Sequence, residues 1–273
     1  MNSSLFAYAA RLLKERAALV LEPGKEYLLE ARIAPVAKKH GLASAEAFLE
    51  LIQKSSQEAH ISELIEAMVT TETMFFRDIV PFESLRKSVL PELIQARKES
   101  RQLSIWCAAS SSGQEPYTIA IILKEYFPEL ANWTIKLLAT DISQEMLQRC
   151  KKGIYSQFEV NRGMPAPLLL KYFQQTGTTW QINESIRRMV DFQPLNLASN
   201  WSSFPKCDLI FLRNVMIYFD VKMKQGILRR VADRLSPGGY LVLGGAETTF
   251  HLVDFFERVE HLKHGFYRVK RDS

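Results

Sequence analysis

The feature that most constrains the fold is an alternation, beyond about residue 77, of short apolar runs with longer amphipathic segments. The apolar runs are SIWCAA, TIKLLATD, CDLIFLRN and YLVLGG, and the segments between them include EPYTIAIILKEYF and VKMKQGILRRVADRLS. Apolar runs of this length indicate buried strands, and the amphipathic segments have the three- and four-residue spacing of helices. Strands that alternate with helices predict an α/β fold with a doubly wound, mostly parallel sheet.

The first 72 residues follow a different pattern. Four stretches, at 6–21, 25–41, 44–55 and 58–69, carry apolar residues at helical spacing. Gly41 suits a helix end and Ser44 suits the N-cap of the next helix. Because 47% of the 273 residues are hydrophobic, the chain has enough apolar material for a sizeable core. We therefore predict a small helical domain over residues 1–72 and the sheet domain over 73–273.

Residues 155–196 depart from the alternation of strands and helices. A helical stretch, APLLLKYF, is followed by two short β-prone runs, TTWQI and IRRMVDF, on either side of Asn183, Glu184 and Ser185. Two such runs around a short polar connection predict an antiparallel β-hairpin. We therefore expect a β-subdomain inserted into the sheet domain at about residues 174–193.

Composition argues against several classes of protein. The N-terminus lacks the apolar stretch of a signal peptide and no run is long enough to span a bilayer, so we expect a cytoplasmic protein without membrane insertion. Cys107, Cys150 and Cys207 have no C-x-x-C spacing, which argues against disulfides and thiolate metal cages. His261 and His264 are close in sequence but suit a loop better than a metal site. The net charge of +5 favours acidic partners without requiring nucleic acid.

Residues that carry chemistry follow the first two predicted strands. WCAASSSGQEPYTIA, residues 106–120, suits a strand, a small-residue turn and a helix, which together let the backbone approach a nucleotide-type ligand. Glu115 opens that helix, where its carboxylate either complements the helix dipole or accepts hydrogen bonds from a ligand. Asp141 ends the next strand, where it either caps the helix that begins near Ser143 or binds both hydroxyls of a ribose.

The third strand also ends in polar residues. DLIFLRNVMIYFD, residues 208–220, places Arg213, Asn214 and Tyr218 at or just beyond its carboxyl end. Polar groups that follow a buried apolar strand need solvent or partners. The sequence therefore favours a ligand site at this edge of the sheet over a purely structural role for these residues.

Together, these elements resemble the class I S-adenosylmethionine methyltransferases, and their sequence motifs are similar to those of one family within that class. The motifs TTETMFFRD, WCAASSSGQEPYTIA, ATDIS, Leu195-Asn196, FLRNVMIYFD and LSPGGYLVLGGAE occur in the order of the CheR family, the glutamate methyltransferases of chemotaxis receptors. They cover nearly the whole chain, and TTETMFFRD and RNVMIYF are specific to this family.

The resemblance implies a cofactor, a substrate and a set of site residues. The cofactor is S-adenosylmethionine, which becomes S-adenosylhomocysteine, and the substrate is a glutamate side chain in the cytoplasmic methylation helices of chemoreceptors. Tyr218 is implied to lie close to the transferring methyl group. The residues implied to line the cofactor pocket are Thr71, Thr73, Arg77, Glu115, Asp141, Asn196, Leu197, Arg213 and Asn214.

Arg77 and Tyr218 are the candidate catalytic residues. A glutamate side chain has an unperturbed pKa of ~4.3, so at neutral pH the nucleophile is already ionised and needs alignment instead of a general base. We expect Phe75 and Phe76 to anchor the segment while Arg77 binds a carboxylate of the substrate or the cofactor. The alternatives are a structural salt bridge for Arg77 and ring packing for Tyr218.

The chain departs from the family pattern in three places. Thr71 stands where the family often has Asn, and Gly245 and Ala246 replace a frequent His-Ser in the strand before Glu247. We expect Pro35 to interrupt the basic helix that is proposed to contact receptors in the family. The first two departures concern the pocket, and the third concerns receptor docking, for which Arg32, Lys38 and Lys39 are candidates.

Receptor tethering is a further point on which the family divides. Some members bind a pentapeptide at the receptor's C-terminus by adding it as a strand to the inserted hairpin, and the resemblance implies that these members carry a longer, glycine-containing connection. Here only Asn183-Glu184-Ser185 joins the two predicted strands, and Gly177 precedes the first. We therefore expect no dependence on such a pentapeptide.

The motifs and the charge distribution disfavour two other classes of enzyme. A nicotinamide-linked dehydrogenase would carry G-x-G-x-x-G after the first strand, where this chain has AASSSGQE. A nucleic-acid methyltransferase is disfavoured because there is no Asn-Pro-Pro-Tyr-like motif and the basic residues are dispersed. A catalytically silent module that binds S-adenosylmethionine for signalling, and a methyltransferase with a different substrate, remain the alternatives.

Overall fold

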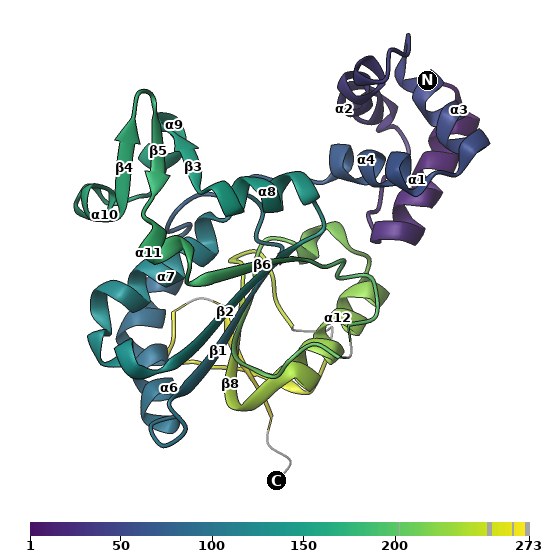
Figure 1. Cartoon of the computed structure of the whole chain (residues 1–273). Helices are drawn as coiled ribbons and strands as arrows, with labels where there is room; N and C mark the ends of the chain where they lie inside the picture. The colour runs from purple at the N-terminus through teal and green to yellow at the C-terminus, as the bar shows by residue number, and fades with distance from the viewer. Residues whose placement is uncertain (202, 250–252, 264, 271–273) are drawn as a thin grey trace.

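The computed structural model describes residues 1–201, 203–249, 253–263 and 265–270 (Figure 1). His264, one of the two histidines expected to lie in a loop and not in a metal site, lies outside these residues. The N-terminal part is helical, as predicted, and Figure 1 shows its helices gathered to one side of the sheet. They are α1 (Ser3–Ala17), α2 (Glu26–Lys39), α3 (Ala45–Ser55) and α4 (Glu58–Met68).

The four helices bury their apolar faces in one core. Leu13, Ile33, Phe48 and Leu64 are each at most 1% exposed and come from different helices. The side chain of Ser44 accepts a hydrogen bond from the Ala47 amide at 3.2 Å, which confirms the predicted N-cap of α3.

The expected interruption at Pro35 is wrong. Residues Glu26–Lys39 form one helix with Pro35 inside it. Pro35 has no N–H to donate to Ala31, yet burial of Leu29, Ile33 and Ala37 on one face keeps the helix continuous.

The sheet domain contains seven strands in the order β6-β2-β1-β7-β8-β10-β9. The four apolar runs form its centre as parallel neighbours, which confirms the predicted doubly wound, mostly parallel sheet. At one end of the sheet, β10 pairs antiparallel with both β8 and β9. The bounds are β1 (Gln102–Ala108), β2 (Thr134–Asp141), β6 (Val190–Pro194), β7 (Cys207–Leu212), β8 (Leu235–Leu243), β9 (Phe256–Arg258) and β10 (Phe266–Val269).

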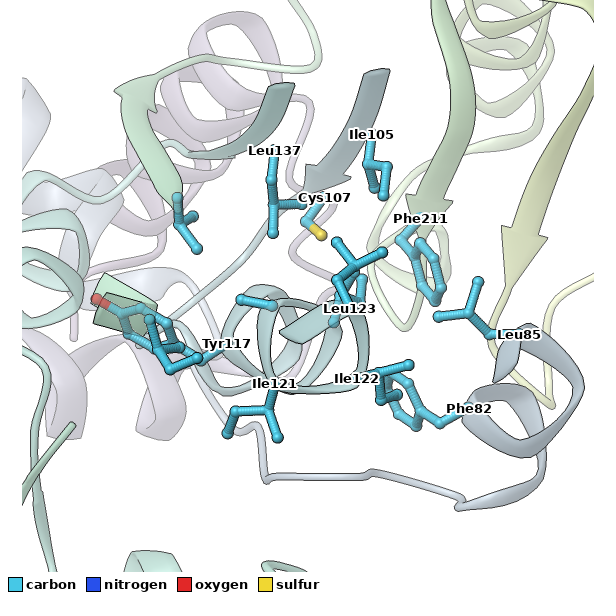
Figure 2. Packing of buried hydrophobic residues seen from close by; sticks show 14 of the residues in the cluster. Phe82, Leu85, Ile105, Cys107, Tyr117, Ile121, Ile122, Leu123, Leu137 and Phe211 are labelled. Atoms are coloured by element: carbon cyan, nitrogen blue, oxygen red, sulfur yellow. The ribbon is translucent and has the colours of Figure 1, made fainter. Parts of the chain in front are cut away.

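Helices cover both faces of this sheet. On one face, α7 (Gln114–Tyr126) packs against alternate strand residues such as Ile105, Cys107 and Phe211, as Figure 2 shows. On the other face, α12 (Val221–Arg234) packs against Trp106 and Ile210. Successive side chains of a strand point to opposite faces, so a continuous apolar run such as SIWCAA serves both layers.

A separate three-stranded antiparallel sheet, in the order β3-β5-β4, forms the inserted subdomain (Figure 1). Its strands are β3 (Ile154–Ser156), β4 (Phe173–Thr176) and β5 (Thr179–Ile182). The hairpin connection is Gly177-Thr178, because Thr176 pairs with Thr179.

The predicted pairing of TTWQI with IRRMVDF is therefore wrong. Residues Glu184–Arg187 form helix α11, and the second run continues as β6, which pairs parallel with β2 in the main sheet. Val190 and Phe192 gain burial at the sheet edge that a small exposed hairpin cannot provide.

Shorter elements connect these parts. Among the described residues, no helix is long and apolar enough to cross a membrane. The remaining elements are α5 (Val80–Ser84), η1 (Leu85–Val89), α6 (Leu90–Ala96), η2 (Pro128–Asn132), α8 (Gln144–Lys152), α9 (Gln157–Asn161), α10 (Ala166–Tyr172) and η3 (Met216–Tyr218).

Candidate active site

A cleft opens at the carboxyl ends of β1, β2 and β7. The structure brings all of the sequence-predicted site residues to its walls, although their roles toward a ligand stay predictions. They are Thr71, Thr73, Arg77, Glu115, Asp141, Asn196, Leu197, Arg213, Asn214 and Tyr218. Ligands of doubly wound sheets bind at this edge, where the chain passes from strands into loops.

Asp141 is held by main-chain amides and does not itself cap the following helix. Its Oδ2 accepts from the Ser111 amide at 2.7 Å and its Oδ1 accepts from the Ser143 amide at 2.9 Å. The N-cap of α8 is Ser143, whose hydroxyl accepts from the Met146 amide. Burial raises the pKa of Asp141, and the amide hydrogen bonds oppose that rise. The carboxylate therefore has a fixed orientation at the cleft wall, with lone pairs left for another donor.

The turn between β1 and α7 brings its backbone close to the cleft. Ala109, Ser110 and Ser111 line it with small side chains. Gly113 is the N-cap of α7 at φ +93°, and a Cβ at that position would lie 3.0 Å from the Cys150 sulfur. Both the backbone conformation and the close contact with α8 therefore favour a glycine at this position.

Arg213 is a buried cation shared by two carboxylates. Its side chain is 1% exposed, with Nη1 2.8 Å from Glu115 Oε2 and Nη2 2.7 Å from Asp78 Oδ2. Nη2 also donates to the Arg77 carbonyl at 3.2 Å. Burial raises the pKa of Glu115, while the Arg213 guanidinium lowers it. Arg213 thereby joins β7, α7 and the segment that carries Arg77.

The backbone around the cleft adopts left-handed conformations at several non-glycine positions. Three of them line the cleft and three flank Arg77. Each such position costs about 1–3 kcal/mol and persists only where the surrounding structure enforces it. The residues are Phe76, Asp78, Ile79, Ala109, Ser111 and Asn214.

Asn196 joins the helical domain to the cleft. Its Nδ2 donates to the Arg16 carbonyl near the end of α1 at 2.6 Å, and its Oδ1 accepts from the Ala198 amide at 2.9 Å. Ala17 and Leu19 continue from α1 into the cleft wall. Asn196 thus contributes to the attachment of the helical domain, which its predicted role in cofactor binding did not include.

The two candidate catalytic residues both line the cleft. Nη1 of Arg77 donates to the Glu72 carbonyl at 3.2 Å, and the neighbouring Phe75 is fully buried, as expected for an anchor. Phe76 is only partly buried. Tyr218 ends η3 and is half-buried.

Two of the three basic residues considered for receptor docking are engaged within the helical domain. Arg32 donates to the Met68 carbonyl at 2.6 Å, and Lys39 pairs with Glu63 at 2.7 Å. Arg32 therefore fixes the end of α4. Lys38 is exposed on α2.

Sequence reasoning missed the roles of Asp78 and Glu247. Asp78 pairs with Arg213, and Glu247 accepts four main-chain hydrogen bonds beside the cleft. For Glu247 the sequence did offer a signal: the family motif LSPGGYLVLGGAE ends with it, and a carboxylate that follows an apolar strand requires partners. Gly245 and Ala246 lie in an exposed turn after β8 and not, as expected, within the strand.

Fold and cleft together define the class of protein: a class I S-adenosylmethionine-dependent methyltransferase. The family described as "CheR methyltransferase, SAM binding domain" matches residues 71–264, and "CheR methyltransferase, all-alpha domain" matches residues 4–69. The chain belongs to the CheR methyltransferase family, and its cofactor is S-adenosylmethionine. The resemblance carried by the motifs is therefore confirmed.

Full-length relatives agree with this assignment. The "Chemotaxis protein methyltransferase" of Vibrio parahaemolyticus is 37% identical over 265 residues, which cover 96% of this chain and 95% of the relative. The "Chemotaxis protein methyltransferase 1" of Pseudomonas aeruginosa is 38% identical over 265 residues, covering 94% of this chain and 95% of the relative.

The chemistry of the residues that line the cleft also suits S-adenosylmethionine. Two buried polar atoms on its wall, Ser110 Oγ and Arg213 Nε, have no hydrogen-bond partner within the described part of the chain. Buried polar groups are normally paired, so these atoms fit a polar ligand. Asp141 offers acceptors suited to a ribose diol, Glu115 offers one to an amine, and Ile142 and Leu197 add apolar surface for a base.

Proposed function

We propose that this protein transfers a methyl group from S-adenosylmethionine to glutamate side chains of chemoreceptors, producing glutamate methyl esters. The relatives named above are chemotaxis protein methyltransferases, which supports chemoreceptors as the substrate class. The observation that carries the proposal is the set of ionisable side chains that line the cleft.

That set suits an anionic nucleophile. The described residues that line the cleft include two arginines, Arg77 and Arg213, and three carboxylates, Glu72, Glu115 and Asp141, but no histidine, lysine or cysteine. A glutamate carboxylate, with an ordinary pKa of ~4.3, needs no general base at neutral pH, whereas an alcohol or an ammonium group must lose a proton first. Arg213 is already paired with Asp78 and Glu115, so Arg77 is the lining arginine available to bind a carboxylate. A cleft with Arg77 and no histidine base therefore fits carboxylate methylation better than transfer to an amine.

The residues have separate roles in this proposal. The bound cofactor supplies a methyl carbon on a positively charged sulfur, and a carboxylate oxygen forms a bond to that carbon as the carbon–sulfur bond breaks. Arg77 binds a carboxylate at the cleft wall, while Tyr218 borders the transfer position. Asp141 binds the ribose, and Glu115 binds the amino group of the cofactor.

Thr71, Thr73, Asn196, Leu197, Arg213 and Asn214 complete the proposed cofactor site as wall residues. We place the reaction in the cytoplasm, because the methylation helices of chemoreceptors are there. The methylation helices themselves are the proposed binding partner, and no nucleic acid takes part.

The experiment is methyl transfer from labelled S-adenosylmethionine to purified cytoplasmic fragments of candidate receptors. We expect label in the receptor band that is released as volatile methanol by mild base, because carboxyl esters are base-labile. A receptor fragment whose methylated glutamates are replaced by glutamine is the control and should take up no label. Base-stable label would indicate a different acceptor group, and cofactor binding without any transfer would indicate a silent signalling module.

A further inference from the structure

A buried carboxylate outside the cleft wall organises one side of the cleft. Oε2 of Glu247 accepts from the Asn214 amide at 2.7 Å and from the Gly244 amide at 2.8 Å. Oε1 accepts from the Val215 amide at 3.0 Å and from the Met216 amide at 2.8 Å. Glu247 is 8% exposed and is not among the residues that line the cleft. Its side chain therefore acts on the cleft through the main chain of residues 214–216.

Those three amides belong to the segment that bends from β7 into η3. Asn214 has φ +58°, a conformation that a non-glycine residue adopts only at a cost. The Tyr218 amide donates to the Val215 carbonyl at 3.2 Å, so the position of Tyr218 depends on the main chain that Glu247 holds. Asn214, Val215, Tyr218 and Phe219 all line the cleft.

The approach of the carboxylate depends on a glycine. A Cβ at Gly244 would lie 2.8 Å from Glu247 Oε2 and 2.7 Å from Asn214 Nδ2. The adjacent Gly245 has nothing within 4 Å of an added Cβ. Neither glycine has a positive φ. Replacing either one with alanine therefore tests whether there is space for the added methyl group, without straining the backbone.

We propose that Glu247 is a positioning residue that holds Asn214 and Tyr218 in place for methyl transfer. If Glu247 served only to stabilise the turn after β8, the hydrogen bond from the Gly244 amide would be enough. Three of the four hydrogen bonds instead reach a segment 31 to 33 residues earlier in the chain. The inference concerns this chain's own residues, but its kinetic measurement rests on the proposed receptor substrate.

The first variant is Glu247→Gln. An amide nitrogen cannot accept a hydrogen bond, so whichever way the new side chain lies, at least one amide of residues 214–216 loses its acceptor. We expect hydrogen exchange over residues 214–216 to accelerate by about tenfold or more, while β1 and α7 keep wild-type exchange. We expect kcat at saturating cofactor to fall by about thirtyfold with receptor KM within about threefold of wild type.

The second variant, Gly244→Ala, displaces the carboxylate without removing its charge, and we expect the same pattern. Gly245→Ala is its matched control and should behave as wild type. Unchanged exchange over 214–216 in Glu247→Gln would overturn the proposal, and so would exchange that accelerates equally throughout the domain, because that result indicates a general loss of stability. If wild-type protein methylates no receptor fragment, the proposed substrate fails while the exchange measurement still decides the role of Glu247.

Discussion

Arg213 and Glu115 form an ion pair across the carboxyl edge of the sheet, with Arg213 Nη1 2.8 Å from Glu115 Oε2. Asp78 takes the second arm of the same guanidinium but is 45% exposed on its side chain, whereas Glu115 is only 13% exposed. The two carboxylates therefore depend on Arg213 to different degrees, because water can solvate Asp78 but hardly reaches Glu115.

Arg213→Met should destabilise the protein by about 3–5 kcal/mol, because it leaves the buried carboxylate of Glu115 without its counter-charge. The free energy of unfolding from denaturant titration measures this loss. The double variant Arg213→Met/Glu115→Gln should recover part of it, since no unpaired charge remains. Additive losses in the double variant would contradict a direct coupling between the two residues.

Cofactor affinity should weaken on acidification at a pH above the ordinary glutamate pKa of ~4.3. Burial raises the pKa of Glu115 despite the opposing Arg213, so this carboxyl takes up a proton earlier than an exposed one as pH falls. A protonated carboxyl binds the amino group of the cofactor less well. Calorimetric titration with S-adenosylhomocysteine from pH 8 downward measures the effect.

The raised pKa of Glu115 also determines how the free energy of unfolding changes with pH. Because the folded state binds this proton more tightly than the unfolded chain, the Glu115 contribution to the free energy of unfolding decreases as pH rises through the interval between the two pKa values. Glu115→Gln should bind S-adenosylhomocysteine more weakly than wild type at neutral pH. Its affinity for S-adenosylhomocysteine should also change less with pH. Burial also raises the pKa of Asp141, so some dependence remains.

Arg77→Ala should reduce turnover by about a hundredfold or more, because the carboxylate loses its positioning group at the cleft wall. Within the described residues its side chain donates to the Glu72 carbonyl, so the loss of stability should be only about 0.5–1.5 kcal/mol. Arg188→Ala, which removes an arginine that is 77% exposed on its side chain, is the control for charge alone. Near-normal receptor methylation by Arg77→Ala would refute the assignment.

Gly163→Ala should be far more damaging than Gly177→Ala. Both glycines have positive φ, so either substitution costs about 1–2 kcal/mol from the backbone. Only at Gly163 would the new Cβ lie 2.1 Å from the Phe75 carbonyl oxygen, whereas nothing lies within 4 Å of Gly177. The comparison of unfolding midpoints isolates this contact, and equal shifts would show that the subdomain does not press on the Phe75 segment.

The central sheet could be predicted because a buried parallel strand leaves a clear pattern. SIWCAA and its three counterparts are apolar on both faces, and the helices between them are long enough to show their period. The β-subdomain could not be predicted equally well. Short runs such as TTWQI and IRRMVDF show that strands form but not which strand each one joins, since β6 pairs with residues about 50 positions away.

The residues of the site also differ in how far the sequence predicts them. Asp141 was identified because it ends a strand, and Glu115 because it opens the helix that follows the neighbouring strand. The carboxyl ends of these two strands meet at one edge of the sheet. The role of Glu247 could not be read from the sequence, because its partners are main-chain amides and any residue type provides those. The contact of Asn196 with Arg16 was hidden for the same reason, since it joins a side chain to a carbonyl 180 residues away.

The observed hairpin predicts no receptor tethering, although its connection differs from the one expected from the sequence. Gly177 lies within the connection, but that connection has only two residues, and the edge strands β3 and β4 have three and four. An edge of four residues offers a five-residue peptide few main-chain partners. We therefore expect no heat when a receptor's C-terminal pentapeptide is titrated into the protein.

Deletion of the receptor's C-terminal tail should likewise leave its methylation rate unchanged, because recognition then rests on the methylation helices alone. Tethering works by raising the local concentration of enzyme near its substrate, so a tethered enzyme would lose rate at low receptor concentration and regain it at high concentration. Rates compared at both concentrations thus distinguish the two cases. Micromolar binding of the pentapeptide, or a loss of rate confined to low receptor concentration, would show that the four residues of β4 suffice to hold the tail.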